Sequence, residues 1–237
     1  MATIARGVTR DVEALARAGF DAVIVENFGD APFMPGAVEP ITVAAMTIAV
    51  RAARESSSLV VGVNVLRNDA LSALAIASAT GSSFIRVNVH VGAVIADQGL
   101  IEGSAHKTLR ARAAWGAERI AIWADVDVKH AAAIAPRPLV DVAKDATLRG
   151  LAEAVLITGK ATGAPADPAD VARLRPAIDA PIYVASGTTP EELPRLAEAG
   201  AHGVVVGSWL RRNGKAGDPI DARRAASFAR AFARAFG

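Results

Sequence analysis

The chain has 237 residues, of which 52% are hydrophobic and 21% are charged, a globular composition that argues against disordered and collagen-like chains. It contains no Cys, which excludes a disulfide framework, a thiolate zinc site and a cysteine nucleophile, and fits a cytoplasmic protein. Its 26 Lys and Arg against 24 Asp and Glu leave a net charge of +2, too small to indicate a nucleic-acid surface. No apolar run approaches the ~20 residues of a bilayer span, so we expect no membrane insertion.

Apolar, β-branched runs alternate along the chain with Ala-rich stretches at helical spacing. A helix over residues 4–18 precedes the first strand. The predicted strands are 21–26, 59–66, 84–89, 119–125, 154–158, 181–185 and 203–206. The later helices are predicted at 38–54, 69–80, 104–115, 138–149 and 168–178, with one more after Thr189 and a last one that runs to Phe236. Parallel strands need crossover connections of this kind, so the pattern predicts a parallel sheet covered by helices.

Two helix starts are indicated by capping residues. In Thr189-Pro190-Glu191-Glu192, Thr stands at the N-cap, Pro at the first helical position and Glu at the third, which is a capping box. Asp218-Pro219 is predicted to begin the last helix in the same way.

The architecture predicted from these elements is a single α/β domain over residues 1–237, because no linker or composition shift divides the chain. We interpret it as a TIM (β/α)8-type barrel that lacks its first strand, since seven strands are countable and a helix comes before them. A doubly wound sheet is the alternative, but the Gly-rich turn typical of that fold is missing after the first strand.

Polar residues gather at the C-terminal ends of the predicted strands. Side chains alternate along a strand, so Arg86, Asn88 and His90 share one face of their strand, and Asp125, Asp127 and Lys129 share one face of the next. The other polar residues at strand ends are Glu26, Asn27, Asn64, Arg67, Thr158 and Gly159. Such residues are costly to bury without partners, and barrel enzymes place their sites at this end. We therefore expect them to surround a common cavity at the barrel mouth.

The last two strands predict a phosphate site. Ser186 and Gly187 follow one strand, and Gly207 and Ser208 follow the other. Small residues allow backbone N–H groups to approach an anion, and a short helix after Gly207 would add its dipole. Phosphate commonly binds at this position in barrels, although glycine also ends strands for turn geometry alone.

Two questions of chemistry stay open at this point. Glu26, His90, Asp125 and Asp127 carry metal-binding groups but lack local ligand spacing, so we expect no cofactor and keep a divalent metal as the less favoured alternative. Lys129 would form a Schiff base if its pKa were depressed. An ion pair with Asp125 or Asp127 is the simpler interpretation of that lysine.

Several longer motifs resemble a known family. The resemblance is carried by residues 25–33, 61–69 and 84–90, and it continues at 97–99, 102–103, 124–126, 128–131, 158–159 and 161–163. These segments resemble the BtpA/SgcQ family. The resemblance implies a TIM barrel related to phosphate-binding barrels, and it links the chain both to photosystem I biogenesis and to sugar metabolism.

The chain departs from the family pattern in two places. Family members begin with a strand and a Pro-rich segment to which nothing here corresponds, so either the start is internal to a longer product or the barrel closes with seven strands. In the second case two strand edges stay open, which a homo-oligomer would relieve. At Asp127 the resemblance implies His, and a carboxylate is ionised at neutral pH whereas His titrates near it.

Two hypotheses about function follow. The first is an enzyme that acts on a small phosphorylated metabolite, such as a sugar phosphate, by lyase- or isomerase-type chemistry. Glu26, His90 and Asp125 are its acid–base candidates, and Arg86, Asn64 and Asn88 would stabilise developing negative charge. Ser186, Gly187, Gly207 and Ser208 would hold the phosphate. The alternative is a non-catalytic biogenesis or stability factor for a membrane complex such as photosystem I, and an exposed apolar patch would favour it.

Overall fold

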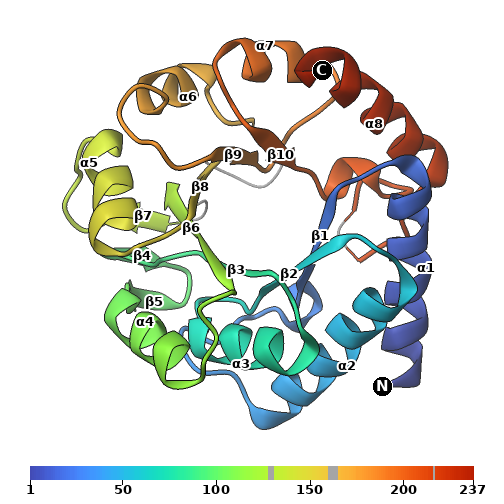
Figure 1. Ribbon diagram of the computed structural model, residues 1–237, viewed down its shortest axis with the longest axis horizontal. Helices are drawn as coiled ribbons and strands as arrows, with labels where there is room; N and C mark the ends of the chain where they lie inside the picture. The colour runs from blue at the N-terminus through green and yellow to red at the C-terminus, as the bar shows by residue number, and fades with distance from the viewer. Residues whose placement is uncertain (128–130, 160–164, 216) are drawn as a thin grey trace.

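The computed structural model describes residues 1–127, 131–159, 165–215 and 217–237. Its main sheet has seven parallel strands in the order β1-β2-β3-β6-β8-β9-β10. The strands are β1 (Ala22–Glu26), β2 (Val60–Asn64), β3 (Phe84–Val87), β6 (Ala121–Asp127), β8 (Ala154–Thr158), β9 (Ile182–Ala185) and β10 (Gly203–Val205). The sheet curls on itself with the helices outside it (Figure 1). All seven predicted strands and the barrel-type α/β fold are thereby confirmed.

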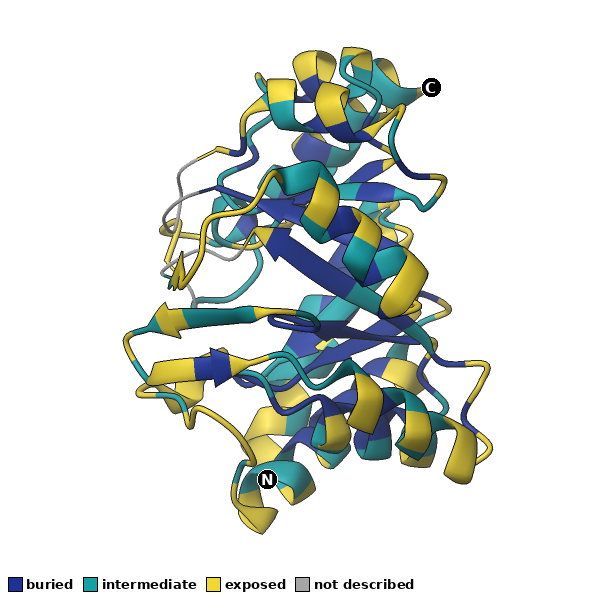
Figure 2. Cartoon of the chain, turned by 90° about the vertical axis from the view of Figure 1, so that its left-hand side faces the viewer, coloured by how far each residue is buried: buried dark blue, intermediate teal, exposed yellow. Residues whose placement is uncertain are grey.

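Helices cover the outer face of this sheet. They are α1 (Ala2–Ala18), α2 (Pro40–Ser56), α3 (Ala70–Thr80), α4 (Ala105–Ala114), α5 (Leu139–Lys144), α6 (Pro168–Leu174), α7 (Leu193–Glu198) and α8 (Ala222–Phe236). A π-helical turn, η2 (Asp145–Arg149), extends α5, and short 3₁₀ turns stand at η1 (Phe28–Asp30) and η3 (Ser208–Leu210). Outward strand residues such as Val61, Ile85 and Ile122 are fully buried against the helices. The strands accordingly form the buried centre of the molecule in Figure 2.

Two of the helices begin differently from the prediction. The N-cap of α8 is Asp221, whose side chain accepts hydrogen bonds from the backbone N–H groups of Arg223 and Arg224, so the helix does not begin at Asp218-Pro219. Residues 190–192 form a turn, and α7 begins only at Leu193. The Asp221 side chain caps two free N–H groups at once, which explains why it sets the start of α8.

The two ends of the sheet meet without pairing. Within the described residues, β1 pairs only with β2, and β10 pairs only with β9. The helical layer nevertheless continues across this break, because α1 packs against both α2 and α8 (Figure 1). The predicted barrel without its first strand is therefore the observed arrangement, with β1 in the position of a second strand.

A small antiparallel sheet was not predicted. It consists of β4 (Ala93–Ala96), β5 (Gly99–Glu102) and β7 (Ala131–Ala133), in the order β5-β4-β7. Its strands belong to the segments that follow β3 and β6, at the C-terminal end of the barrel. In Figure 2 it projects from the buried body of the molecule and carries much exposed surface.

Candidate active site inside the barrel

The interior of the barrel contains an aromatic layer. Phe84 stacks on Trp123 with ring centroids 4.0 Å apart, and Trp123 stacks on Tyr183 at 4.3 Å. Gly62 makes room for this stack, because a Cβ atom there would lie 2.2 Å from the Phe84 ring. The three aromatic residues come from β3, β6 and β9. They form one layer inside the barrel. The residues two positions later on each strand point to the same side and form the next layer, toward the C-terminal ends of the strands.

An ion-pair cluster lies above the aromatic layer. Arg86 donates two parallel hydrogen bonds to Asp125, from Nε to Oδ1 and from Nη2 to Oδ2, both 2.9 Å long. Its Nη1 contacts Glu26 Oε1 at 3.3 Å. The side chains of Arg86 and Asp125 are 8% and 1% exposed, whereas that of Glu26 is 27% exposed. Glu26 is therefore the more exposed of the two carboxylates in this cluster.

Two amides extend the cluster. Asn88 Nδ2 donates to Asp125 Oδ2 at 2.9 Å. Asn64 Nδ2 donates to Asn88 Oδ1 at 3.1 Å and to the Arg86 carbonyl oxygen at 3.0 Å. We call Glu26, Asn64, Arg86, Asn88 and Asp125 the polar network. It joins four adjacent strands or strand ends, so the structure brings these five predicted residues together as expected.

Burial and the charges of the polar network shift the pKa values of Arg86 and of Arg67, which is not part of that network. Burial lowers the pKa of Arg86, but the nearby carboxylates of Asp125 and Glu26 outweigh burial and raise it above its ordinary value. Arg67, only 5% exposed, has a lowered pKa because burial outweighs the attraction of Asp125 and other acidic groups. Both arginines have ordinary pKa values far above neutrality, so the site holds two positive groups opposite two carboxylates.

His90 lies outside the polar network. Its Nε2 lies 2.7 Å from the carbonyl oxygen of Gly150, and the residue is 1% exposed. Strand β3 ends at Val87, and beyond a strand the alternation of faces no longer holds. The prediction that His90 shares the inward face with Arg86 and Asn88 is therefore wrong. Burial lowers the pKa of His90, and its catalytic role stays a prediction.

The predicted alternation also breaks near the end of β6. A bulge between Asp125 and Asp127 shifts the pairing with β8. Asp125 pairs with Leu156 and Asp127 pairs with Ile157, so two residues that are two apart on β6 pair with adjacent residues on β8. Asp125 is buried whereas Asp127 is exposed, because a bulge inserts one residue and turns the following side chains. The expectation that Asp125 and Asp127 line one side is wrong for this reason. Lys129 lies outside the described residues.

The side chains of Asn27 and Thr158 form hydrogen bonds with backbone groups at the C-terminal mouth of the barrel. Asn27 Oδ1 accepts from the backbone N–H of Leu66 at 2.7 Å, and its Nδ2 donates to the Leu66 carbonyl oxygen at 3.3 Å. Thr158 Oγ1 donates to the Asp127 carbonyl oxygen at 2.5 Å, and Gly159 after it is buried. These contacts tie neighbouring strand ends together. Binding of substrate by Asn27, Arg67, Thr158 and Gly159 stays a prediction.

The predicted phosphate residues lie at the ends of β9 and β10. Ser186 and Gly187 both have positive φ, 77° and 66°, a conformation that opens the backbone toward a ligand or turn. Gly207 is exposed, and a Cβ atom there would meet nothing within 4 Å. Thr188 was not predicted as a site residue; it is 3% exposed, and its Oγ1 has no partner among the described residues. Its position directly after Gly187 is the feature of the sequence that could have identified it.

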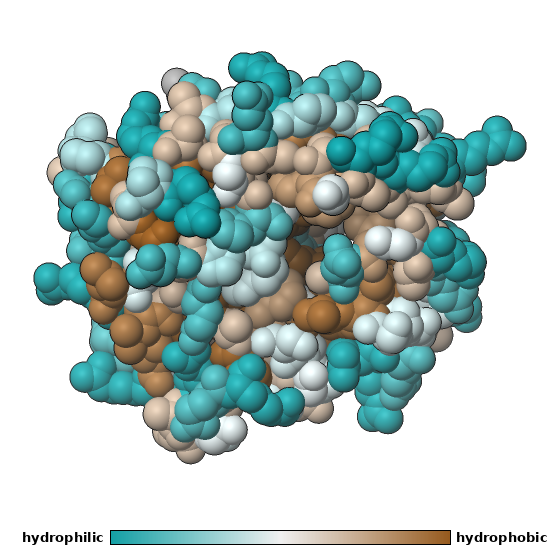
Figure 3. Space-filling model, turned by 45° about the horizontal axis from the view of Figure 1, so that its top comes forward, coloured by the Kyte–Doolittle hydropathy of each residue, from teal (hydrophilic) through white to brown (hydrophobic). Residues whose placement is uncertain are grey.

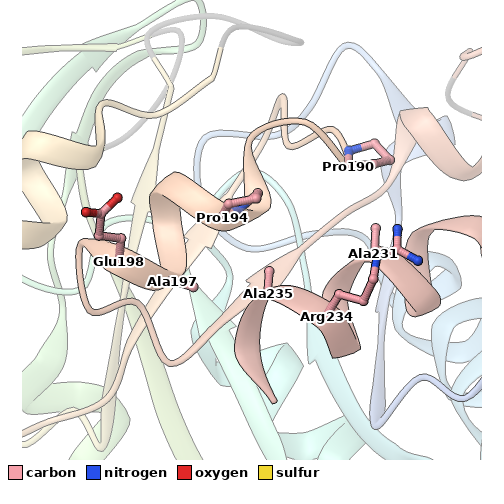
Figure 4. A pocket seen from close by; sticks show the side chains of 7 residues that line it. All are labelled: Pro190, Pro194, Ala197, Glu198, Ala231, Arg234 and Ala235. Carbon is pink, nitrogen blue, oxygen red and sulfur yellow. The ribbon is translucent and has the colours of Figure 1, made fainter.

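Other features of the surface lie apart from the polar network. Within the described ranges, no three His, Asp or Glu side chains form a group that would hold a metal ion. A cavity of about 500 Å³ lies between α7 and α8 on the outside of the barrel (Figure 4). Its lining includes Pro194, Glu198 and Arg234 and no residue of the polar network. On the face in Figure 3, hydrophobic residues form several groups separated by hydrophilic ones.

No helix among the described residues combines the length and the apolar character that crossing a membrane requires.

Comparison with solved structures shows the same fold in known enzymes. The (S)-3-O-geranylgeranylglyceryl phosphate synthase of Thermoplasma acidophilum, solved with sn-glycerol-1-phosphate, is 19% identical with a TM-score of 0.62, covering 98% of this chain and 87% of that one. The N-(5′-phosphoribosyl)anthranilate isomerase of Pyrococcus furiosus is 15% identical with a TM-score of 0.64, covering 94% and 93%.

Sequence comparison extends over nearly the whole chain. A Synechocystis protein named Photosystem I biogenesis protein BtpA is 44% identical over 225 residues, which cover 94% of this chain and 78% of that protein. The model of the BtpA family matches residues 1–234. The resemblance noted in the sequence is thus confirmed, and the chain belongs to the BtpA family.

Proposed function

We propose that this protein is an enzyme that acts on a small phosphorylated metabolite of the sugar-phosphate kind, by lyase- or isomerase-type proton transfer. The observation that carries the proposal is the polar network, because it places a buried ion pair at the C-terminal ends of adjacent barrel strands. Burying an ion pair is costly, and barrel enzymes assemble their sites at this end. The two solved structures described above, whose names include phosphorylated molecules, support the substrate class by analogy of fold.

Glu26 is the acid–base residue of the proposed reaction. Its side chain is 27% exposed and its one contact to Arg86 is 3.3 Å long, so it can reach a substrate proton. Both oxygens of Asp125 accept hydrogen bonds from Arg86, and one also accepts from Asn88. Asp125 therefore positions Arg86, and Arg86 stabilises negative charge that develops on the substrate when Glu26 removes a proton.

The phosphate of the substrate would bind at the ends of β9 and β10. Ser186 and Gly187 offer backbone N–H groups in an unusual conformation, and Gly207 and Ser208 stand on the next strand end. The proposal needs no cofactor, with a divalent metal as the less favoured alternative. A cytoplasmic location and a homo-oligomer stay predictions.

A charge-neutral substitution tests the role of Glu26. A panel of sugar phosphates is screened by thermal shift, and conversion of each stabilising compound is followed by NMR. Glu26→Gln should lower kcat by about 100-fold or more, the usual contribution of a general base. The matched control is Glu55→Gln, which removes the carboxylate of an exposed pair with Arg51 and should leave kcat unchanged. Full activity of the Glu26→Gln enzyme would remove Glu26 from the mechanism.

The second candidate function is a non-catalytic factor for a membrane complex. It draws on the name of the Synechocystis relative and on the small sheet, where Ile95 and Leu100 are cross-strand partners with exposures of 50% and 51%. Paired exposed hydrophobic residues of this kind mark protein-binding surfaces when they form part of a larger patch. This function predicts that Ile95→Glu abolishes assembly of the complex, whereas the enzymatic function predicts that it leaves turnover unchanged.

A further inference from the structure

The Asn64 amide is oriented by its own hydrogen bonds. Its Nδ2 group has two N–H bonds, and both are used, one on the Arg86 carbonyl oxygen and one on Asn88 Oδ1. Turning the amide over would place Oδ1 against two other acceptors. The positions of the amide nitrogen and oxygen of Asn64 therefore follow from the network itself.

The partner of Asn64 is fixed as well. Asn88 Nδ2 donates to Asp125 Oδ2, which leaves Asn88 Oδ1 as the acceptor that faces Asn64. Asp125 is in turn held by two bonds from Arg86. A continuous series of donors and acceptors thus runs from the buried ion pair to Asn64.

The series ends in an acceptor without a donor. Asn64 is 1% exposed, and its Oδ1 has no hydrogen-bond partner among the described residues. A buried polar atom without a partner costs free energy, and in native proteins such atoms are few and call for an explanation. Asn64 sits at the C-terminal end of β2, directly opposite Glu26 of β1 in the strand register. The residue that carries this unpaired oxygen is therefore the strand neighbour of the proposed acid–base carboxylate.

We propose that Asn64 Oδ1 accepts a hydrogen bond from a hydroxyl group of the phosphorylated substrate, and so selects hydroxylated phosphate esters over their deoxy analogues. This inference rests on the proposed function and reverses one part of the sequence-based hypothesis. Asn64 and Asn88 were expected to stabilise negative charge, which requires free N–H groups, but the network uses both N–H groups of Asn64 and directs one of the two N–H groups of Asn88 to Asp125. Asn64 therefore has no N–H group left for charge stabilisation, and its acceptor determines specificity.

Matched ligand pairs test this role. The probes are ribose 5-phosphate with 2-deoxyribose 5-phosphate, glucose 6-phosphate with 2-deoxyglucose 6-phosphate, and glycerol 3-phosphate with propyl phosphate. Their dissociation constants are measured by isothermal titration calorimetry. For at least one pair, the hydroxylated member should bind the unmodified protein about tenfold more tightly, because a site built to bind a hydroxyl leaves its polar atom unpaired with the analogue. In Asn64→Leu this ratio should fall below about twofold.

A neighbouring asparagine provides the control. Asn68 donates to the Val89 carbonyl oxygen at 2.9 Å and accepts from the Val89 backbone N–H at 2.8 Å, so its amide serves the backbone alone. Asn68→Leu should keep the tenfold ratio. If Asn64→Leu does not fold, as judged by circular dichroism, Asn64→Ala takes its place.

The outcomes separate the two proposals. Equal affinity for both members of every pair, or a ratio that survives in the Asn64 variant, overturns the role of Asn64 but leaves the phosphorylated substrate intact. If no compound of the panel and no inorganic phosphate binds, the proposed function itself fails, and the inference fails with it.

Discussion

The two sides of the barrel mouth are built in different ways. On the side of β1, β2, β3 and β6, charged and amide side chains are locked together by hydrogen bonds, and Asp125 is almost fully buried. On the side of β9 and β10, small residues present backbone, with positive φ at Ser186 and Gly187 and an exposed Gly207. One side thus fixes the orientation of its polar groups in advance, whereas the other presents exposed backbone, as the proposed phosphate site requires. A substrate with a reactive polar end and a phosphate end suits this division.

The largest effect is expected from breaking the ion pair. Asp125→Leu leaves the Arg86 guanidinium buried without its main partner, and this should lower the free energy of unfolding by about 3–5 kcal/mol. Urea denaturation measures it. Asp170→Ala, which removes an exposed pair with Arg173, should change stability by no more than about 1 kcal/mol. A loss for Asp125→Leu as small as that of the control would show that the network side is not preorganised by this pair.

A smaller effect is expected on the backbone side. Gly187→Ala forces an L side chain into a positive φ of 66° and should lower the free energy of unfolding by about 1 kcal/mol. Gly207→Ala meets no atom within 4 Å and should leave stability unchanged, while it weakens binding of a sugar phosphate by crowding the anion. Thermal denaturation and calorimetric titration measure the two quantities. If Gly207→Ala binds phosphate as well as the unmodified protein, this side is not the phosphate site.

The smallest effect concerns His90, which belongs to neither side. Burial lowers its pKa in the folded state, so folding favours the neutral imidazole. Its contribution to stability is complete above the unfolded pKa of about 6.5 and decreases as the pH falls below that value. Between pH 7 and pH 5 the Tm should therefore fall more for the unmodified protein than for His90→Gln. Identical Tm losses in the two proteins would contradict the assignment of a buried neutral histidine.

The sequence allowed the seven strands to be predicted because strands buried on both faces leave continuous apolar runs, as in residues 154–158. It also placed Arg86 and Asn88 on one face of their strand and Asp125 on one face of the next, because side chains alternate along an extended backbone. Glu26 was predicted only from its position at a strand end. The position of His90 was missed where β3 stops at Val87, and that of Asp127 was missed at a bulge, which no local pattern marks. In the small sheet, Ala131–Ala133 carries no strand signal, and the apolar segments Ala93–Ala96 and Gly99–Glu102 are only four residues each.

The direction of the Asn64 amide was equally out of reach from sequence. An asparagine can donate or accept, and only its surroundings decide which atom faces a ligand. The hypothesis of charge stabilisation relied on the donor, whereas the contacts of Asn64 with Arg86 and Asn88 use both N–H groups and its oxygen has no partner in the part of the chain that the structure describes.

The seam between β1 and β10 has a mechanical consequence for the two sides of the mouth. Around the sheet, the two sides are linked through the pairing of β6, β8 and β9, whereas no pairing joins β1 to β10 among the described residues. Asp11 of α1 contacts Arg211 beyond β10, and Phe20 stacks on Phe228 of α8 with centroids 6.2 Å apart. In the proposed enzyme, the distance between Glu26 and Gly207 thus depends on helix packing outside the site.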